Sequence, residues 1–144
     1  MREIDDYSYQ CGVMDCFCEM VRAGVKRLAL SHPMDTKQER DALLEYAQEL
    51  CSRYGVQYYP EDEGLITDLF PLSMNRGKYN ILFFKEEKVL EEYLSLKAEK
   101  LVFCQVGGYT AQKRRDLALR YGKLLGYTQE AIDQLIGQNA EKEP

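Results

Sequence analysis

The fold of this chain is decided by residues 25–60, which read VKRLALSHPMDTKQERDALLEYAQELCSRYGVQYYP. A predicted strand over residues 25–30 opens this stretch, and a second one over residues 56–59 closes it. Between them lies an amphipathic helix that begins with a capping box at Thr36 and ends at Gly55. A strand, a helix and a strand within about 35 residues form a βαβ crossover, which predicts two parallel neighbouring strands.

The other elements follow from apolar periodicity and turn residues. Residues 79–84 carry the strongest strand signal, because they are short, aromatic and apolar on both faces, as in a central strand. Residues 65–70 predict a further strand. In residues 7–23 the predicted buried stripe includes Tyr9, Cys16 and Phe17. Helices are predicted over residues 7–23, 86–97, 110–125 and 128–136, of which the last two form a C-terminal helical hairpin.

Together these segments predict an α/β or α+β domain over residues 1–137. Its small mixed sheet has about four strands, starts with the parallel βαβ unit and has helices packed on it. Residues 138–144 are expected to fray. Residues 101–106 fit a strand or a helix, since periodicity does not separate short apolar runs. The alternative fold is a doubly wound parallel sheet in which residues 101–106 form a fifth strand and residues 65–70 lie in a loop.

Composition predicts a soluble protein. The chain has 144 residues, 45% of them hydrophobic, and a formal net charge of −5. This hydrophobic fraction excludes a disordered chain, and no apolar run approaches the ~20 residues that span a bilayer. The acidic balance argues against a nucleic-acid binder. Residues 1–6 lack the apolar core of a secretory signal, so five reduced cysteines and a cytoplasmic location are expected, with neither nucleic acid nor membrane as a partner.

The single histidine lies in the stretch that points most clearly to chemistry. Ser31, His32 and Asp35 follow the first predicted strand. In a parallel βαβ unit both strands end at one edge of the sheet, where ligands tend to bind. Glu61 and Asp62, after the second strand, would face His32 there. Because carboxylates favour imidazolium, we expect His32 to be a proton donor or a metal ligand, with Ser31 and Asp35 as further catalytic candidates and Glu61 and Asp62 as ligand-binding residues.

A simpler interpretation is that Asp35 or Thr36 caps the next helix and that His32 is a surface residue. No metal site is predicted, since one histidine with scattered carboxylates falls short of the convergent ligands that zinc requires. The cysteine spacing C-x4-C-x-C matches no common zinc knuckle either. Cys16 and Cys51 are interpreted as small core residues.

Two glycines before a helix form the second candidate site. Gly107 and Gly108 precede Thr110, and Lys113 and Arg114 stand in the first turn of the predicted helix. Free backbone N–H groups at a helix start, together with cations, can hold an anion. The spacing matches neither a P-loop nor a dinucleotide-binding motif, so it identifies no cofactor. The alternative is a solvated basic helix face, or one that matches the protein's own acidic residues.

Two classes of function stay open. The preferred one is a non-catalytic interaction or small-ligand-binding module, whose partner is a small anionic ligand or a second copy held by opposed acidic and basic surfaces. The alternative is a small enzyme that acts at the His32 edge on a phosphorylated or other anionic substrate, with Lys113 and Arg114 clamping the charge. No pair of acid–base groups with motif-grade spacing supports the enzyme. Among the 11 tyrosines, Tyr127 is one that could line a pocket or an interface.

Overall fold

The computed structural model describes residues 1–144. Helices dominate it, and none of them combines the length and the apolar character needed to cross a membrane. In chain order the elements are α1 (Asp6–Arg22), β1 (Leu28–Leu30), α2 (Lys37–Asp41), α3 (Leu44–Tyr54), β2 (Gln57–Glu61), α4 (Leu72–Asn75), β3 (Asn80–Phe84), α5 (Glu87–Gln105), α6 (Ala111–Leu124) and α7 (Gln129–Gln138).

The sheet has three strands and is antiparallel, with β3 in the centre and β1 and β2 at the edges. Phe84 of β3 pairs with Leu28 on one side and with Gln57 on the other. The prediction of a neighbouring parallel pair is wrong, because β1 and β2 run in the same direction but β3 lies between them and opposes both. β3 is buried along its whole length, as its apolar sequence predicts for a central strand.

The predicted fourth strand is absent. Residues 65–70 form an irregular segment, in which two backbone N–H groups bond to side chains. The Leu65 N–H donates to the Tyr93 hydroxyl (3.0 Å), and the Leu69 N–H donates to Thr67 Oγ1 (3.2 Å). Residues 101–105 continue α5, which excludes the doubly wound alternative with its fifth strand.

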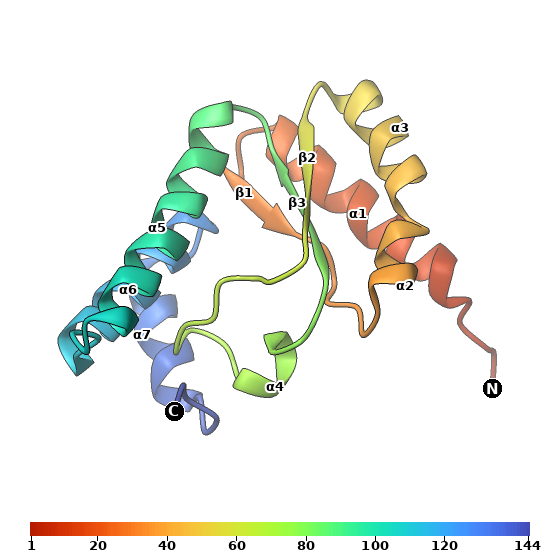
Figure 1. The fold of residues 1–144 in the computed structure, drawn as a ribbon. Coiled ribbons are helices and arrows are strands. Elements are labelled where there is room, and N and C mark those ends of the chain that lie inside the picture. The colour runs from red at the N-terminus through yellow and green to blue at the C-terminus, as the bar shows by residue number, and fades with distance from the viewer.

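Two helical layers cover the two faces of the sheet (Figure 1). Ile81 and Phe83 of β3 pack into a core with α1 and α3, and Leu82 and Phe84 pack into a second core with α5, α6 and α7. This alternation follows from the period of two along a strand. The expected C-terminal helical hairpin is formed by α6 and α7.

Helix α1 buries a different stripe from the one its sequence predicts. Tyr9 is 50% exposed, and Cys16 is exposed, so its interpretation as a core residue is wrong. The helix carries two apolar stripes, and the sheet covers only one of them. The residues that it buries are Gln10, Met14, Cys18 and Val21.

Residues 138–144 pack back onto the molecule, unlike the frayed end that the sequence predicts. Asn139 is buried, and its Nδ2 donates to the carbonyl oxygens of Asp68 (3.0 Å) and Phe70 (3.1 Å). Glu143 is also buried, and its carboxylate accepts a hydrogen bond from the Tyr109 hydroxyl (2.7 Å). Polar contacts hold this segment, which is why apolar periodicity does not reveal it.

Candidate ligand-binding site

One edge of the sheet brings together the ends of β1 and β2 and the start of β3. Ser31, directly after β1, is buried, and its Oγ accepts a hydrogen bond from the Ile81 N–H (2.8 Å). The same hydroxyl donates to the carbonyl oxygen of His32 (3.3 Å), and Asn80 Nδ2 donates to the carbonyl oxygen of Ser31 (3.0 Å). Ser31 therefore positions the loop that carries His32, and its hydroxyl is already bonded on both sides.

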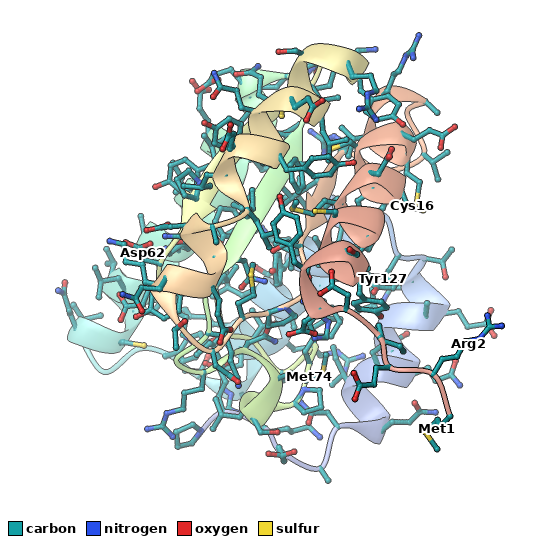
Figure 2. The ribbon with its side chains drawn as sticks, turned by 90° about the vertical axis from the view of Figure 1, so that its right-hand side faces the viewer. Met1, Arg2, Cys16, Asp62, Met74 and Tyr127 are labelled. Carbon is teal, nitrogen blue, oxygen red and sulfur yellow. The ribbon has the colours of Figure 1, made fainter.

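A cavity of about 410 Å³, here called the Lys26 cavity, opens beside this loop. The second apolar stripe of α1 forms one wall, and the turn after α6 forms another. In Figure 2, Tyr127 lies beside α1, with Met74 below it. Both the volume and the mostly apolar lining are typical of small-molecule sites. The apolar walls include Tyr9, Val13, Phe17, Phe70, Met74 and Tyr127.

Lys26 supplies the cation of this cavity. Its Nζ donates to the carbonyl oxygen of Leu125 (2.7 Å) at the C-terminal end of α6, which occupies one of its three protons. It lies 5.8 Å from the ring centre of Phe17 and 5.5 Å from that of Tyr127. Burial lowers the pKa of Lys26, and no carboxylate opposes that effect. An anion in the cavity would favour the charged form of this side chain.

A second cavity, of about 340 Å³, shares His32 and Pro33 with the first one. We call it the Gln10 cavity. Its lining differs in character from that of the Lys26 cavity, because the acidic residues Asp6, Asp35 and Glu39 belong to it. The Lys78 ammonium bonds to Asp35 and holds the pKa of that carboxyl below its usual value.

Gln10 lines this second cavity and is only 8% exposed. Its Oε1 is the one buried side-chain oxygen or nitrogen of the chain that has no hydrogen-bond partner. Nearly all buried polar groups in proteins are hydrogen-bonded, so an exception needs a physical reason.

His32 is exposed, and its imidazole meets the Tyr9 ring edge to face, with ring centres 6.4 Å apart. No ion pair joins the imidazole to a carboxylate, since Asp35 is engaged by Lys78. The loop therefore gathers Ser31, His32 and Asp35 without forming a linked acid–base pair.

The acidic turn after β2 lies in a separate network around Arg40, which is 1% exposed. The Arg40 guanidinium donates to the carbonyl oxygens of Glu61 (2.9 Å) and Asn80 (3.0 Å) and to the Asp62 carboxylate (2.5 Å). The last of these bonds holds the pKa of Asp62 below its usual value. This arrangement ties β2 to β3 at the edge of the sheet.

The Glu61 carboxylate is occupied as well. It accepts hydrogen bonds from the Tyr93 hydroxyl (2.7 Å) and from Lys97 Nζ (2.9 Å). Neither Glu61 nor Asp62 lines the two cavities beside His32, and Figure 2 shows Asp62 well apart from Tyr127. The expected convergence of His32 with the acidic turn is not observed.

The glycines before α6 and the cations in its first turn do not leave an open anion site. Arg114 makes a two-pronged ion pair with Asp68 (3.0 and 3.2 Å), and it also donates to the carbonyl oxygen of Glu143 (2.7 Å). The basic helix thus matches the protein's own acidic residues at this position, as the alternative interpretation states. Lys113 has no carboxylate partner, and its Nζ lies 4.1 Å from the ring centre of Phe103.

The neighbouring polar residues have local roles. Thr110 caps α6 by accepting a hydrogen bond from the Lys113 N–H (3.3 Å). Gly107 has a φ of 69°, which lets the chain turn after α5. Gly108 lies directly under Lys113, so that a Cβ there would stand 3.5 Å from Nζ. These contacts explain the motif as a helix connection.

Sequence reasoning missed Lys26 and Gln10. Lys26 stands in a segment that reads as a strand, where a lysine is ordinary. The signal that could have revealed the Lys26 cavity lies in α1, which has more apolar residues than one buried stripe can contain. Gln10 gives no signal until the buried face of α1 is known.

Comparisons with known proteins add nothing to this picture: no family model, no curated protein and no solved structure matches the chain. No three His, Cys, Asp or Glu side chains lie close enough together to hold a metal ion. The site is therefore interpreted from its own geometry.

Proposed function

We propose that this protein is a non-catalytic small-ligand-binding module, and that the Lys26 cavity takes a small carboxylate with an apolar or aromatic body. The observation that carries this proposal is the half-buried Lys26 ammonium, which has no carboxylate partner and stands in an apolar wall. A carboxylate from outside would supply the missing charge.

Other cations support this interpretation by contrast. A charge that is partly removed from water is costly unless it is paired. Apart from Lys26, Lys113 is the one half-buried cation without such a pair, and it lies over an aromatic ring. The buried and half-buried cations that pair with carboxylates inside the chain are Arg40, Lys78, Lys97, Lys100, Arg114 and Arg120.

The chemistry of the cavity favours a carboxylate over a neutral ligand. Two protons of the ammonium are free to bond both oxygens of a carboxylate, and the aromatic walls match a hydrocarbon body. At about 4 Å and an effective dielectric constant of about 20, the two charges attract by roughly 4 kcal/mol before desolvation is subtracted. If only about 1.4 kcal/mol survives, the acid still binds tenfold better than its amide.

The enzyme and self-association hypotheses have less support. An enzyme at the His32 edge needs the carboxylates of Glu61 and Asp62, and these are bonded to Lys97 and Arg40. Association through opposed charges needs basic residues on the surface, and three of these, Arg114, Arg115 and Arg120, are paired with carboxylates of the same chain. Binding in the Lys26 cavity needs one cation without a carboxylate partner, and Lys26 is such a cation.

Calorimetric titration tests the proposal with phenylacetate and hexanoate, each compared with its neutral amide. Lys26→Met removes the charge and keeps an unbranched side chain, and Lys26→Arg restores a cation. Lys113→Met is the matched control, because it removes the other half-buried ammonium that has no carboxylate partner.

We expect the wild type, Lys26→Arg and Lys113→Met to bind the acids, and Lys26→Met to bind them at least tenfold more weakly. The amides should bind weakly to all four proteins. Equal binding of acids and amides, or full affinity in a folded Lys26→Met variant, would overturn the proposal.

A further inference from the structure

We propose that the ligand of the Lys26 cavity carries a second carboxylate, which pairs with the protonated imidazole of His32 at the other end of the cavity. This inference rests on the proposed function, because Lys26 holds the first carboxylate. It narrows the class of ligand to linear dicarboxylates, and it makes their binding depend on pH.

Lys26 and His32 stand near opposite ends of the α1 wall of this cavity. Lys26 Nζ lies 5.8 Å from the ring centre of Phe17, and the ring centres of His32 and Tyr9 are 6.4 Å apart. Tyr9 and Phe17 belong to the same helix, in which eight residues of separation correspond to about 12 Å along the axis. All four residues line the cavity. A linear molecule that lies along α1 therefore brings one end to Lys26 and the other to His32.

The stretch between the two cations is apolar. Val13 lies between Tyr9 and Phe17 on the same stripe of α1, and Leu30 of β1 also lines the cavity. A hydrocarbon chain suits this stretch, whereas a charged group in its middle would lose water without gaining a partner. A cationic group at each end and apolar walls between them match a linear dicarboxylate.

The charged groups around His32 leave its imidazole without a carboxylate partner. Asp35, in the same loop, is paired with Lys78. Asp6 of α1 and Glu39 of α2 line the neighbouring Gln10 cavity together with His32, and neither forms an ion pair with it. Their negative charge favours the protonated imidazole. A carboxylate at the end of a ligand can therefore supply the partner that the chain does not.

Between about pH 6 and about pH 8.5, His32 is the group at this end of the cavity whose charge is expected to change. In peptides, carboxyl groups titrate near pH 4 and phenols near pH 10, so the acidic residues and the neighbouring Tyr7 and Tyr9 keep their charge states. Imidazole gains its proton within this range. The second carboxylate is therefore held at about pH 6 and released at about pH 8.5.

Calorimetric titration with suberate and with its monoamide, at about pH 6 and about pH 8.5, tests this inference. The two ligands have the same chain and one carboxylate for Lys26, but only suberate has a second carboxylate. Suberate can also enter with either end, which favours it equally at both pH values. The readout is therefore the change with pH in the ratio of the two affinities, to which Lys26 contributes nothing because it meets both ligands alike.

Three variants separate the imidazole from other charges. His32→Asn removes the titratable group, and His32→Lys keeps a positive charge at both pH values. Lys88→Asn is the control, because Lys88 is an exposed cation on α5 that does not line the cavity.

We expect the affinity ratio of suberate to its monoamide to rise about threefold from pH 8.5 to pH 6 in the wild type and in Lys88→Asn. The gain is modest because the imidazole is exposed, and exposed ion pairs are weak. In His32→Asn the ratio should stay low at both pH values, and in His32→Lys it should stay high at both.

A ratio that does not change with pH in the wild type would overturn this inference, and so would a rise that persists in His32→Asn. In either case both ligands still bind, so the proposed function stands. When neither ligand binds the wild type, the proposed function itself fails, and the second carboxylate fails with it.

Discussion

Replacing Gln10 by leucine is expected to stabilise the unliganded protein. Gln10 is only 8% exposed, and its Oε1 has no partner. A buried polar atom without a hydrogen bond costs about 1–3 kcal/mol, and leucine removes that atom. Glutamine and leucine have similar helix propensities, so α1 itself contributes little to the difference. The free energy of unfolding should therefore rise by about 1–3 kcal/mol.

This change in the free energy of unfolding is large enough to measure by thermal unfolding. With an unfolding entropy of ~2.1 cal/mol/K per residue, a chain of 144 residues has about 0.3 kcal/mol/K in total. A gain of about 1–3 kcal/mol then raises Tm by roughly 3–10 °C. Urea unfolding followed by circular dichroism gives the same quantity at 25 °C, provided that the slope with urea is unchanged.

The control and the refuting result are both specific. Gln48→Leu changes an exposed glutamine on α3 and should stay within about 0.5 kcal/mol of the wild type. A Gln10→Leu variant that is no more stable than the wild type would mean that Oε1 costs nothing in solution.

Two further predictions concern packing and ionisation. Gly122→Ala should destabilise the protein by about 1–3 kcal/mol, because the new Cβ would stand 2.6 Å from Ile132 Cγ1. Gly12→Ala should instead stabilise α1 by about 0.5–1 kcal/mol, since its new Cβ would meet nothing within 4 Å. Urea unfolding that gives the opposite order of stability would contradict the packing. Arg40 lowers the pKa of Asp62 in the folded state, so the contribution of Asp62 to stability is present above its unfolded pKa of about 3.8 and is lost as the pH falls through the folded value. Carboxyl titration by NMR should show that Arg40→Gln returns the pKa of Asp62 toward that ordinary value, and an unchanged pKa would contradict the pairing.

The order of the strands shows where local sequence stops being informative. Residues 79–84 are apolar on both faces, and this pattern correctly predicts a buried central strand. Residues 25–60 correctly indicate a strand, helical turns and a strand, but nothing within them indicates that β3 is inserted between β1 and β2. Pairing partners are chosen by the whole chain, because a strand that is apolar on both faces is most stable in the centre of a sheet, where helices cover both faces. A pattern within 36 residues cannot contain that competition.

The candidate site could be predicted only in part, for a related reason. Sequence reasoning found the loop with His32 and Asp35, which lies beside both cavities. It also chose Glu61 and Arg114, whose charges are instead neutralised by partners distant in sequence, Lys97 and Asp68. A charged residue looks the same in a sequence whether it is paired or free. Only the fold shows which charges lack a partner.

Helix α1 contributes residues to the lining of both cavities. A helix that only covered a sheet would need one apolar stripe, with polar residues elsewhere. Here the stripe that faces the sheet contains the polar Gln10, and the stripe that faces the Lys26 cavity contains the apolar Tyr9 and Phe17. Both departures from a simple amphipathic pattern occur where the helix lines a cavity. Because stability alone explains neither, the two departures together are the strongest reason to regard this edge of the molecule as a place where ligands bind.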